Sequence, residues 1–313
     1  MDLFIVGGAV HGALLGLPVQ YHDNIRRSAE FGAAARLPKP DRPLPYKRHA
    51  KILLRLIVMY MLCEMLPCIA PDTALFLDFD GTLVELAFQP ESVEVPPDLI
   101  STLAALSMQL NGALALVSGR RLLDLDGFLA PLQLPAAGEH GAQRRSADGR
   151  LVSAPATDLQ QVRHAAEGLL QRHPNLKLER KNLALSLHYR HAPELEKMCL
   201  QVMRKAVALS PGLDLMPGKY VIDVKPAGTN KGAAIQAFMA EAPFAGRVPL
   251  FAGDDVTDEA GFDQVQRMGG YAVKVGPGPT LARHRCASVA QLFAWLQSAR
   301  AARRETDSQR HPA

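Results

Sequence analysis

The chain has 313 residues, of which 48% are hydrophobic and 21% charged, so most of it is expected to fold around a sizeable core rather than remain disordered. The formal net charge of +4 comes from residues 1–70, which hold nine Lys or Arg against five Asp or Glu, while the other 243 residues are neutral. A neutral body lacks the basic face that nucleic acid requires, so we expect no nucleic-acid partner. Four cysteines without a disulfide framework or a metal-ligand spacing indicate a reducing compartment, the cytoplasm.

The first 70 residues are predicted to be an N-terminal extension. Residues 1–50 show no sustained hydrophobic period and contain the Pro-rich run RLPKPDRPLPY, which is typical of linker or disorder. The next segment, KILLRLIVMYMLCEML, has a longest uncharged run of eight residues, Leu56–Cys63, whereas a membrane-spanning helix needs about 20. We therefore expect one amphipathic helix here and no membrane span.

The natural start of translation is a separate hypothesis about the same region. The patterned part of the chain begins only at Pro71, which favours initiation at Met59, Met61 or Met65. Detection of Met1 by intact-mass measurement of the natively expressed protein would contradict it.

From residue 73 onward, short apolar runs alternate with helical patterns, which indicates an α/β fold with a parallel sheet covered by helices. The predicted strands are Ala74–Phe79, Ala113–Val117, Val248–Ala252 and Tyr271–Val275. The predicted helices are Pro97–Gln109, Lys231–Met239, Asp255–Met268 and Val289–Ala299.

The middle of the chain has a different pattern. In LKLERKNLALSLHYR, leucines alternate with small or polar residues, as in half-buried antiparallel strands, and LDLMPGKYVIDVKP is expected to complete this sheet. Helical patterns flank it at Asp158–Gln171 and Pro193–Ala208. We therefore predict an inserted α+β cap domain. The predicted domains are a core at 71–146 and 218–300, the cap at 147–217 and a tail at 301–313.

The first predicted strand carries two carboxylates in DFDGT, where a buried charge requires a compensating cation or a chemical task. Period-two alternation places Asp78 and Asp80 on the same side of the strand. One carboxylate could then attack while the other moves a proton. Alone, the motif is equally consistent with a strand that ends in an Asx-type turn.

Three further motifs follow predicted strands or turns, where open α/β sheets bind ligands. Ser118 and Gly119 in VSGR could hold a phosphate oxygen through a hydroxyl and backbone N–H groups, although a serine there is more often a helix N-cap. Lys231 in KPAGTNKG could offset phosphate charge if it points into a crevice. LFAGDDVTDE places Asp254, Asp255 and Asp258 together, which suits Mg²⁺, although acid-rich helix starts are common without a metal.

In this order the four motifs resemble those of the haloacid dehalogenase superfamily, over residues ~73–300. The resemblance implies a Rossmannoid core and a phosphotransferase mechanism in which Asp78 forms an aspartyl-phosphate. Asp80 would protonate the leaving oxygen and then activate water. The implied Mg²⁺ ligands are the Asp78 carboxylate, the Asp80 carbonyl and Asp254, with Asp255 and Asp258 as further candidates. The implied phosphate-binding residues are Thr82, Ser118, Gly119 and Lys231.

The segments LERKNLALSLHYR, PGKYVIDVKPAGTNKG and AAGEHGAQRR resemble the trehalose-6-phosphate phosphatase family, in its bacterial single-domain form. The resemblance implies that the cap binds the sugar. Asp223 departs from the family, which has Glu there, and Glu139 stands at a variable position. The implied substrate-binding residues are Glu179, Lys181, Lys219, Asp223 and His140, although a solvated sheet face is an alternative for the cap residues.

The resemblance implies that trehalose 6-phosphate is hydrolysed to trehalose and phosphate, the last step of trehalose biosynthesis, with a functional link to a trehalose-6-phosphate synthase. One alternative is a phosphatase for another sugar phosphate, such as sucrose 6-phosphate or a glycosyl-phosphoglycerate. A second is a non-catalytic regulatory module that binds sugar phosphates. The presence of Asp78, Asp80, Lys231 and Asp254 speaks against the second.

Overall fold

The computed structural model describes residues 66–87 and 92–310, with side chains described up to residue 300. The predicted amphipathic helix and nearly all of the predicted N-terminal extension lie outside these residues. Within the described part of the chain, no helix combines the length and apolar character needed to cross a membrane.

The larger sheet has eight strands in the order β12-β11-β10-β1-β2-β3-β4-β5. Its first six strands in this order pair in parallel, whereas β4 and β5 pair antiparallel at one edge. The central strands are buried along nearly their whole length, as expected where helices cover both faces. The strands are β1 (Thr73–Leu77), β2 (Leu114–Val117), β3 (Ala136–Gly138), β4 (Gln143–Arg145), β5 (Leu151–Ser153), β10 (Val248–Gly253), β11 (Tyr271–Val275) and β12 (His284–Cys286).

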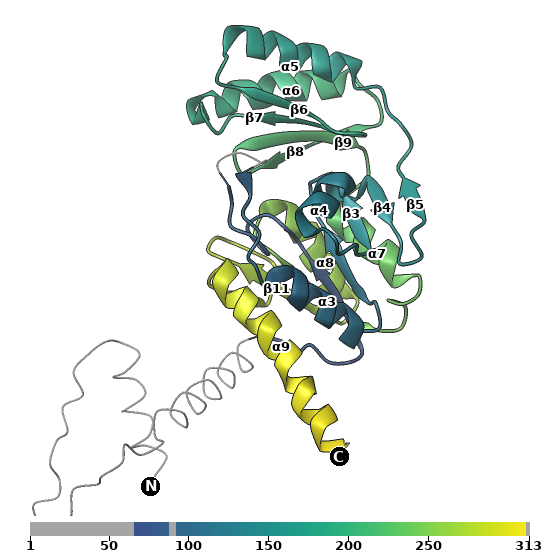
Figure 1. Cartoon of the computed structure of the whole chain (residues 1–313). Helices are drawn as coiled ribbons and strands as arrows, with labels where there is room; N and C mark the ends of the chain where they lie inside the picture. Colours follow the sequence, from purple (N-terminus) through teal and green to yellow (C-terminus); the bar gives the residue numbers. More distant parts are fainter. Residues whose placement is uncertain (1–65, 88–91, 311–313) are drawn as a thin grey trace, which may run out of the picture. The chain divides into compact units, whose positions relative to one another are not determined.

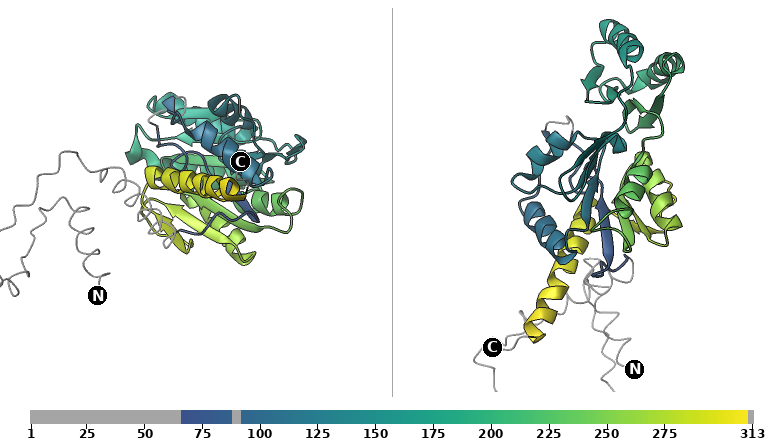
Figure 2. Two further views of the ribbon diagram at one scale, coloured as in Figure 1. Left: turned by 60° about the horizontal axis from the view of Figure 1, so that its bottom comes forward. Right: turned by 90° about the vertical axis from the view of Figure 1, so that its right-hand side faces the viewer.

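Helices cover both faces of this sheet, with α3 and α4 on one side and α7 and α8 on the other (Figure 2). The C-terminal helix α9 anchors the chain through Trp295, which is buried and donates a hydrogen bond from Nε1 to the Pro67 carbonyl at 3.2 Å. The helices are α3 (Leu99–Gln109), α4 (Leu122–Leu129), α7 (Lys231–Met239), α8 (Glu259–Arg267) and α9 (Val289–Arg310). The predicted tail at 301–313 is thus helical as far as Arg310, because helix-forming Ala, Arg and Glu continue the pattern.

A second sheet of four antiparallel strands, in the order β6-β7-β9-β8, is covered on one face by α5 and α6 (Figure 1). We call this unit the cap. It has its own apolar core, built from inward residues of the strands and helices such as Leu187, Ile222 and Met203. Its elements are α5 (Gln160–Arg172), β6 (Lys177–Arg180), β7 (Leu185–His188), α6 (Glu196–Ala208), β8 (Leu213–Gly218) and β9 (Val221–Pro226).

The inserted segment differs from the predicted boundaries at both ends. β5, predicted to lie in the cap, pairs with β4 in the larger sheet. β9 is a central strand of the cap sheet, as expected for the segment that ends at Pro226, so the predicted boundary at residue 217 is too early. The predicted boundary between residues 217 and 218 falls at the end of β8, just before the tight turn into β9. β9 ends at Pro226 and α7 begins at Lys231, so only residues 227–230 separate a cap strand from a core helix.

Candidate active site

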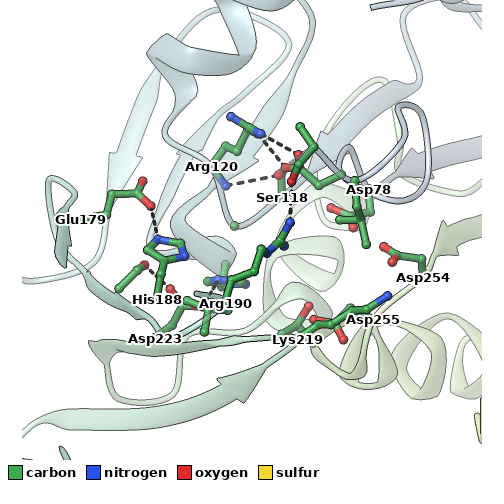
Figure 3. A pocket seen from close by; sticks show the side chains of 18 of the residues that line it. Asp78, Ser118, Arg120, Glu179, His188, Arg190, Lys219, Asp223, Asp254 and Asp255 are labelled. Carbon is green, nitrogen blue, oxygen red and sulfur yellow. Dashed lines mark hydrogen bonds and ion pairs between the residues drawn. The ribbon is translucent and has the colours of Figure 1, made fainter. Parts of the chain in front are cut away.

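A cleft of about 290 Å³ lies at the carboxyl ends of β1, β2 and β10, and residues of the cap complete its wall (Figure 3). This volume is near the lower end of the range for small-molecule sites, about 300–1,000 Å³. Twelve of the fourteen predicted site residues line the cleft; Thr82 and Asp258 do not. The twelve are Asp78, Asp80, Ser118, Gly119, His140, Glu179, Lys181, Lys219, Asp223, Lys231, Asp254 and Asp255.

Asp78 is the first residue after β1, and its backbone N–H still donates to Ala252 of β10 at 2.9 Å. The turn that follows depends on Gly81, whose φ of +74° favours glycine. A Cβ at Gly81 would lie 2.2 Å from Oδ2 of Asp254. The absence of a side chain at Gly81 therefore lets the first and fourth motifs come together.

Lys231 begins α7 and is almost completely buried. Its Nζ lies 2.8 Å from Asp78 Oδ1 and donates to Asp258 Oδ1 at 2.6 Å. Burial lowers the pKa of Lys231, but the charges of Asp258 and Asp78 outweigh burial and raise it above the ordinary value. The lysine is therefore held charged beside the predicted nucleophile.

One carboxylate oxygen from each of Asp78, Asp254 and Asp258 lies within 4.8 Å of the other two. Burial, followed by the charge of Asp258, raises the pKa of Asp78 well above its ordinary value and that of Asp254 to about 7. Because three crowded carboxylates share one lysine, full ionisation of all three is unfavourable without a further cation. An oxygen-only donor set of this kind fits a hard divalent cation, so these residues could hold one.

The carboxylates of the other two predicted metal ligands, Asp80 and Asp255, have other partners. For Asp80 the predicted ligand is the backbone carbonyl, so the contacts of its side chain do not bear on that prediction. Asp80 accepts two hydrogen bonds of 2.6 Å from the Arg120 guanidinium. Asp255 caps the following 3-10 turn: its Oδ1 accepts from Val256 N–H at 2.8 Å, and its own N–H donates to Asp258 Oδ2 at 2.9 Å. The structure thus places Asp258, rather than the side chains of Asp80 and Asp255, with Asp78 and Asp254.

Thr82 was predicted as a site residue but does not line the cleft, whereas Arg120 lines the cleft without having been predicted. Thr82, predicted to bind phosphate, is fully buried, and its hydroxyl lies 3.4 Å from Asp254 Oδ1. Arg120 was given no role, although it follows Ser118 and Gly119 directly and lines the cleft. A cation beside a phosphate-type loop was the available signal in the sequence.

The loop after β2 packs directly on His140. Ser118 is buried, and its Oγ accepts a hydrogen bond from Arg120 N–H at 3.2 Å. A Cβ at Gly119 would lie 2.5 Å from Cε1 of His140, so only glycine allows this approach. His140 Nε2 lies 3.2 Å from Asp223 Oδ2, while its buried Nδ1 has no hydrogen-bond partner among the described residues.

Asp223 is the centre of a polar cluster on the cap. Its carboxylate accepts from Ser186 Oγ and from Lys181 Nζ, the latter at 3.3 Å, and it faces His140. Burial raises the pKa of Asp223, but the charge of Lys181 and the contact with His140 outweigh burial and hold it far below its ordinary value. Ser186, which sequence reasoning missed, is brought opposite Asp223 by the β7–β9 register.

Glu179 and Lys219 complete the cap wall of the cleft. Glu179 Oε2 lies 2.8 Å from His188 Nε2. Burial raises the pKa of Glu179, but the hydrogen bond from His188 and the charge of Lys181 lower it overall. Lys219 is exposed in the turn between β8 and β9. Negatively charged hydrogen-bond acceptors and positively charged donors of the cap thus face the same cleft (Figure 3).

The free energy of unfolding is expected to fall less on acidification in His140→Gln than in the wild-type protein. Burial lowers the pKa of His140 below 6.5 more strongly than Asp223 raises it. The unfolded chain therefore binds a proton below about pH 6.5 that the folded chain does not, and wild-type stability falls by up to about 1.4 kcal/mol per pH unit there. Urea unfolding of both proteins at pH 7.5 and 5.5 measures this difference. Equal acid losses in the two proteins would contradict it.

A family model described as Trehalose-phosphatase matches residues 76–291. The chain belongs to the trehalose-phosphatase family. The resemblance inferred from the four motifs and the cap segments is thereby confirmed. The matched range begins in β1 and ends in α9, so it contains every residue of the cleft.

Curated relatives in the trehalose-phosphatase family include the trehalose-6-phosphate phosphatase of Escherichia coli (strain K12), which is 41% identical over 74% of this chain and 88% of its own length. A probable trehalose-phosphate phosphatase of Sinorhizobium fredii is 43% identical over 65% of this chain and 78% of its own. A bifunctional trehalose-6-phosphate synthase/phosphatase of Thermoproteus tenax is 35% identical over 72% of this chain and 32% of its own.

Among solved structures, the C-terminal domain of C. albicans trehalose-6-phosphate phosphatase superposes with a TM-score of 0.68 and 22% identity, over 79% of this chain and 96% of that one. This likeness concerns the fold. The predicted fold class, a haloacid dehalogenase-like α/β core with an α+β cap, is confirmed.

Proposed function

We propose that this protein is a Mg²⁺-dependent phosphatase that hydrolyses trehalose 6-phosphate to trehalose and phosphate. The observation that carries the proposal is the buried Lys231, held between Asp78 and Asp258 at the floor of a cleft whose upper wall is polar. Family membership supports the substrate. The division of the chain into a core that performs the chemistry and a cap that binds the sugar is part of the same proposal.

Asp78 is assigned as the nucleophile and Asp80 as the proton-transfer group. An Asp78 carboxylate oxygen forms a bond to phosphorus while the bond from phosphorus to the sugar oxygen breaks, and Asp80 protonates that oxygen. Water then attacks phosphorus and gives a proton to Asp80. The bond between phosphorus and the Asp78 oxygen breaks, so phosphate is released and the Asp78 carboxylate is regenerated. Because Arg120 holds both Asp80 oxygens, we propose that the incoming phosphoryl group draws Arg120 away from Asp80.

The carboxylates of Asp78, Asp254 and Asp258 would hold Mg²⁺, and the Asp80 carbonyl is proposed as a further ligand. When bound, the ion would supply positive charge that offsets the repulsion between the Asp78 carboxylate and a phosphate dianion. Lys231 contributes in the same direction from its fixed position. Ser118 Oγ and the backbone at Gly119 are proposed to orient the phosphoryl oxygens, and Thr82 is proposed to act indirectly by orienting Asp254.

The cap is proposed to bind the sugar hydroxyls through Glu179, Lys181, Lys219 and Asp223. Carboxylates accept hydrogen bonds from hydroxyls and lysines donate to them, so a surface with both suits a disaccharide better than an apolar substrate. Asp223 already has three partners, and its shorter side chain is proposed to hold Lys181 and His140 in place rather than to reach far into the cleft.

The remaining assignments rest on chemistry and relatives. The bifunctional relative supports a functional link between this reaction and a trehalose-6-phosphate synthase. Cys68, Cys199 and Cys286 are free thiols, which supports a reducing compartment, and we propose the cytoplasm.

Phosphate release from trehalose 6-phosphate, sucrose 6-phosphate and glucose 6-phosphate, each with Mg²⁺ or EDTA, tests the proposal. We expect kcat/KM for trehalose 6-phosphate to exceed that for the other two by at least about tenfold, a difference of about 1.4 kcal/mol in transition-state binding. EDTA should abolish release and excess Mg²⁺ should restore it. Similar rates across the panel would indicate another sugar phosphatase, and no release with Mg²⁺ would indicate a non-catalytic module.

A further inference from the structure

Glu139 occupies a constrained position on the core. Its φ is +50° and that of His140 is +56°, left-handed values that are uncommon for residues other than glycine. Two backbone bonds fix this turn to the loop after β2: Glu139 N–H donates to Arg120 O at 2.8 Å, and His140 N–H donates to Ser118 O at 3.0 Å. The Glu139 side chain therefore projects from a fixed point beside the residues 118–120, which we call the phosphate loop.

The carboxylate of Glu139 is bound by the cap. Its Oε1 accepts from the Asn182 N–H at 3.1 Å and its Oε2 from the Leu183 N–H at 2.7 Å. Both donors lie in the turn between β6 and β7, which is closed by a bond from Lys181 N–H to Ala184 O at 3.0 Å. Each oxygen of a fully buried core carboxylate is thus satisfied by the backbone of one cap turn.

This turn and the strand β6 before it each carry a residue that faces the cleft. Lys181 lies within the turn and donates from Nζ to the Gly119 carbonyl of the phosphate loop at 2.8 Å, and Glu179 lies two residues earlier in β6. The position of the turn therefore sets the position of both side chains in the cleft. We propose that Glu139 is a positioning residue that latches the β6–β7 turn of the cap onto the phosphate loop and so places Lys181 and Glu179 for substrate.

The chemistry of the contact explains why a carboxylate is needed. Two neighbouring N–H donors require two acceptors, and an ionised carboxylate has acceptors only, whereas a glutamine amide would turn its NH₂ toward one donor. The bonds join two domains, so they form only when the cap lies against the core. The latch therefore favours the closed cleft without touching the reacting atoms.

Three variants test the latch. Glu139→Gly removes the carboxylate and suits the left-handed backbone, Glu139→Gln preserves volume, and Glu194→Gln makes the same charge change at an exposed cap position. Amide hydrogen exchange of the 181–184 segment is measured in the free full-length protein. KM and kcat are measured with Mg²⁺ for trehalose 6-phosphate and for p-nitrophenyl phosphate, which has no sugar to contact the cap.

For Glu139→Gly we expect exchange of the turn amides to accelerate by about tenfold or more, while β10 amides and Glu194→Gln remain at wild-type rates. KM for trehalose 6-phosphate should rise about tenfold, with kinetics on p-nitrophenyl phosphate within about twofold of wild type. Glu139→Gln should change in the same direction. Unchanged exchange in the turn, or equal losses on both substrates, would overturn the latch.

The kinetic part of this test rests on the proposed function, whereas the exchange part does not. A wild-type protein that releases phosphate from p-nitrophenyl phosphate but not from trehalose 6-phosphate would contradict the proposed substrate. The exchange rates of the turn would still decide for or against the latch.

Discussion

Asp78→Asn is expected to reduce Mg²⁺-dependent phosphate release from trehalose 6-phosphate by about 10⁴-fold or more. An amide nitrogen or oxygen is a far weaker nucleophile than a carboxylate oxygen, so the first bond to phosphorus does not form. The substitution preserves shape, and Lys231 retains Asp258 as a partner at 2.6 Å. The measurement is single-turnover phosphate release, which detects a residual first step that steady-state assays would miss.

The matched control for this prediction is Asp72→Asn. Asp72 is exposed and precedes β1 at the end of the strand opposite Asp78, so the same chemical change there should leave release within about twofold of wild type. Asp78→Asn should also keep the thermal midpoint of wild type or exceed it, because burial makes the Asp78 charge unfavourable in the metal-free protein. Activity that survives in a folded Asp78→Asn variant would overturn the nucleophile assignment.

Lys231→Met is expected to affect both chemistry and stability. Removal of the only cation bonded to Asp78 among the described residues should lower kcat by about 10²–10³-fold, the usual effect of losing one preorganised electrostatic group. Asp78 and Asp258 would be left buried without their partner, which should reduce the free energy of unfolding by about 3–5 kcal/mol. Urea unfolding at pH 7.5 and steady-state kinetics measure the two effects.

Lys197→Met provides the comparison for that variant, because Lys197 is exposed on the cap helix α6. It should change stability by no more than about 0.5 kcal/mol and leave kcat unchanged. Addition of Mg²⁺ should recover part of the lost stability in Lys231→Met, since a cation bound by the three carboxylates replaces some of the missing charge. A Lys231→Met protein as stable as wild type would show that the ion pairs contribute nothing net to folding.

Much of the catalytic end of the site could be predicted from the sequence because parallel strands deliver their carboxyl ends to one edge of a sheet. Asp78 and Asp254 follow strands with strong apolar patterns, so their proximity follows from topology alone. The three-residue strands β3, β4, β5 and β12 were not predicted, because a stretch as short as AAG has no measurable period.

The contacts that complete the site depend on geometry that one sequence does not encode locally. Ser186 meets Asp223 only through the register between β7 and β9, and Arg120 meets Asp80 only because the loops after the paired strands β1 and β2 lie at the same edge of the sheet. The left-handed turn at Glu139 is a further case, since Glu does not signal a positive φ and the enrichment of His at positive φ is too weak to predict one. Pairings across long sequence separations therefore had to come from the structure.

The short link between β9 and α7 has a consequence for how the protein can diversify. Asp223, proposed to organise the sugar contacts, and Lys231, proposed to act on the phosphoryl group, lie eight positions apart on one continuous stretch. Gly228 N–H donates to Asp214 Oδ2 at 2.9 Å and Thr229 Oγ1 donates to Pro226 O at 2.6 Å, so hydrogen bonds hold this segment in one conformation. This segment thus fixes the distance between the sugar-binding residues and the phosphate-binding residues. An insertion within residues 227–230 would change that distance and so select a substrate of different length.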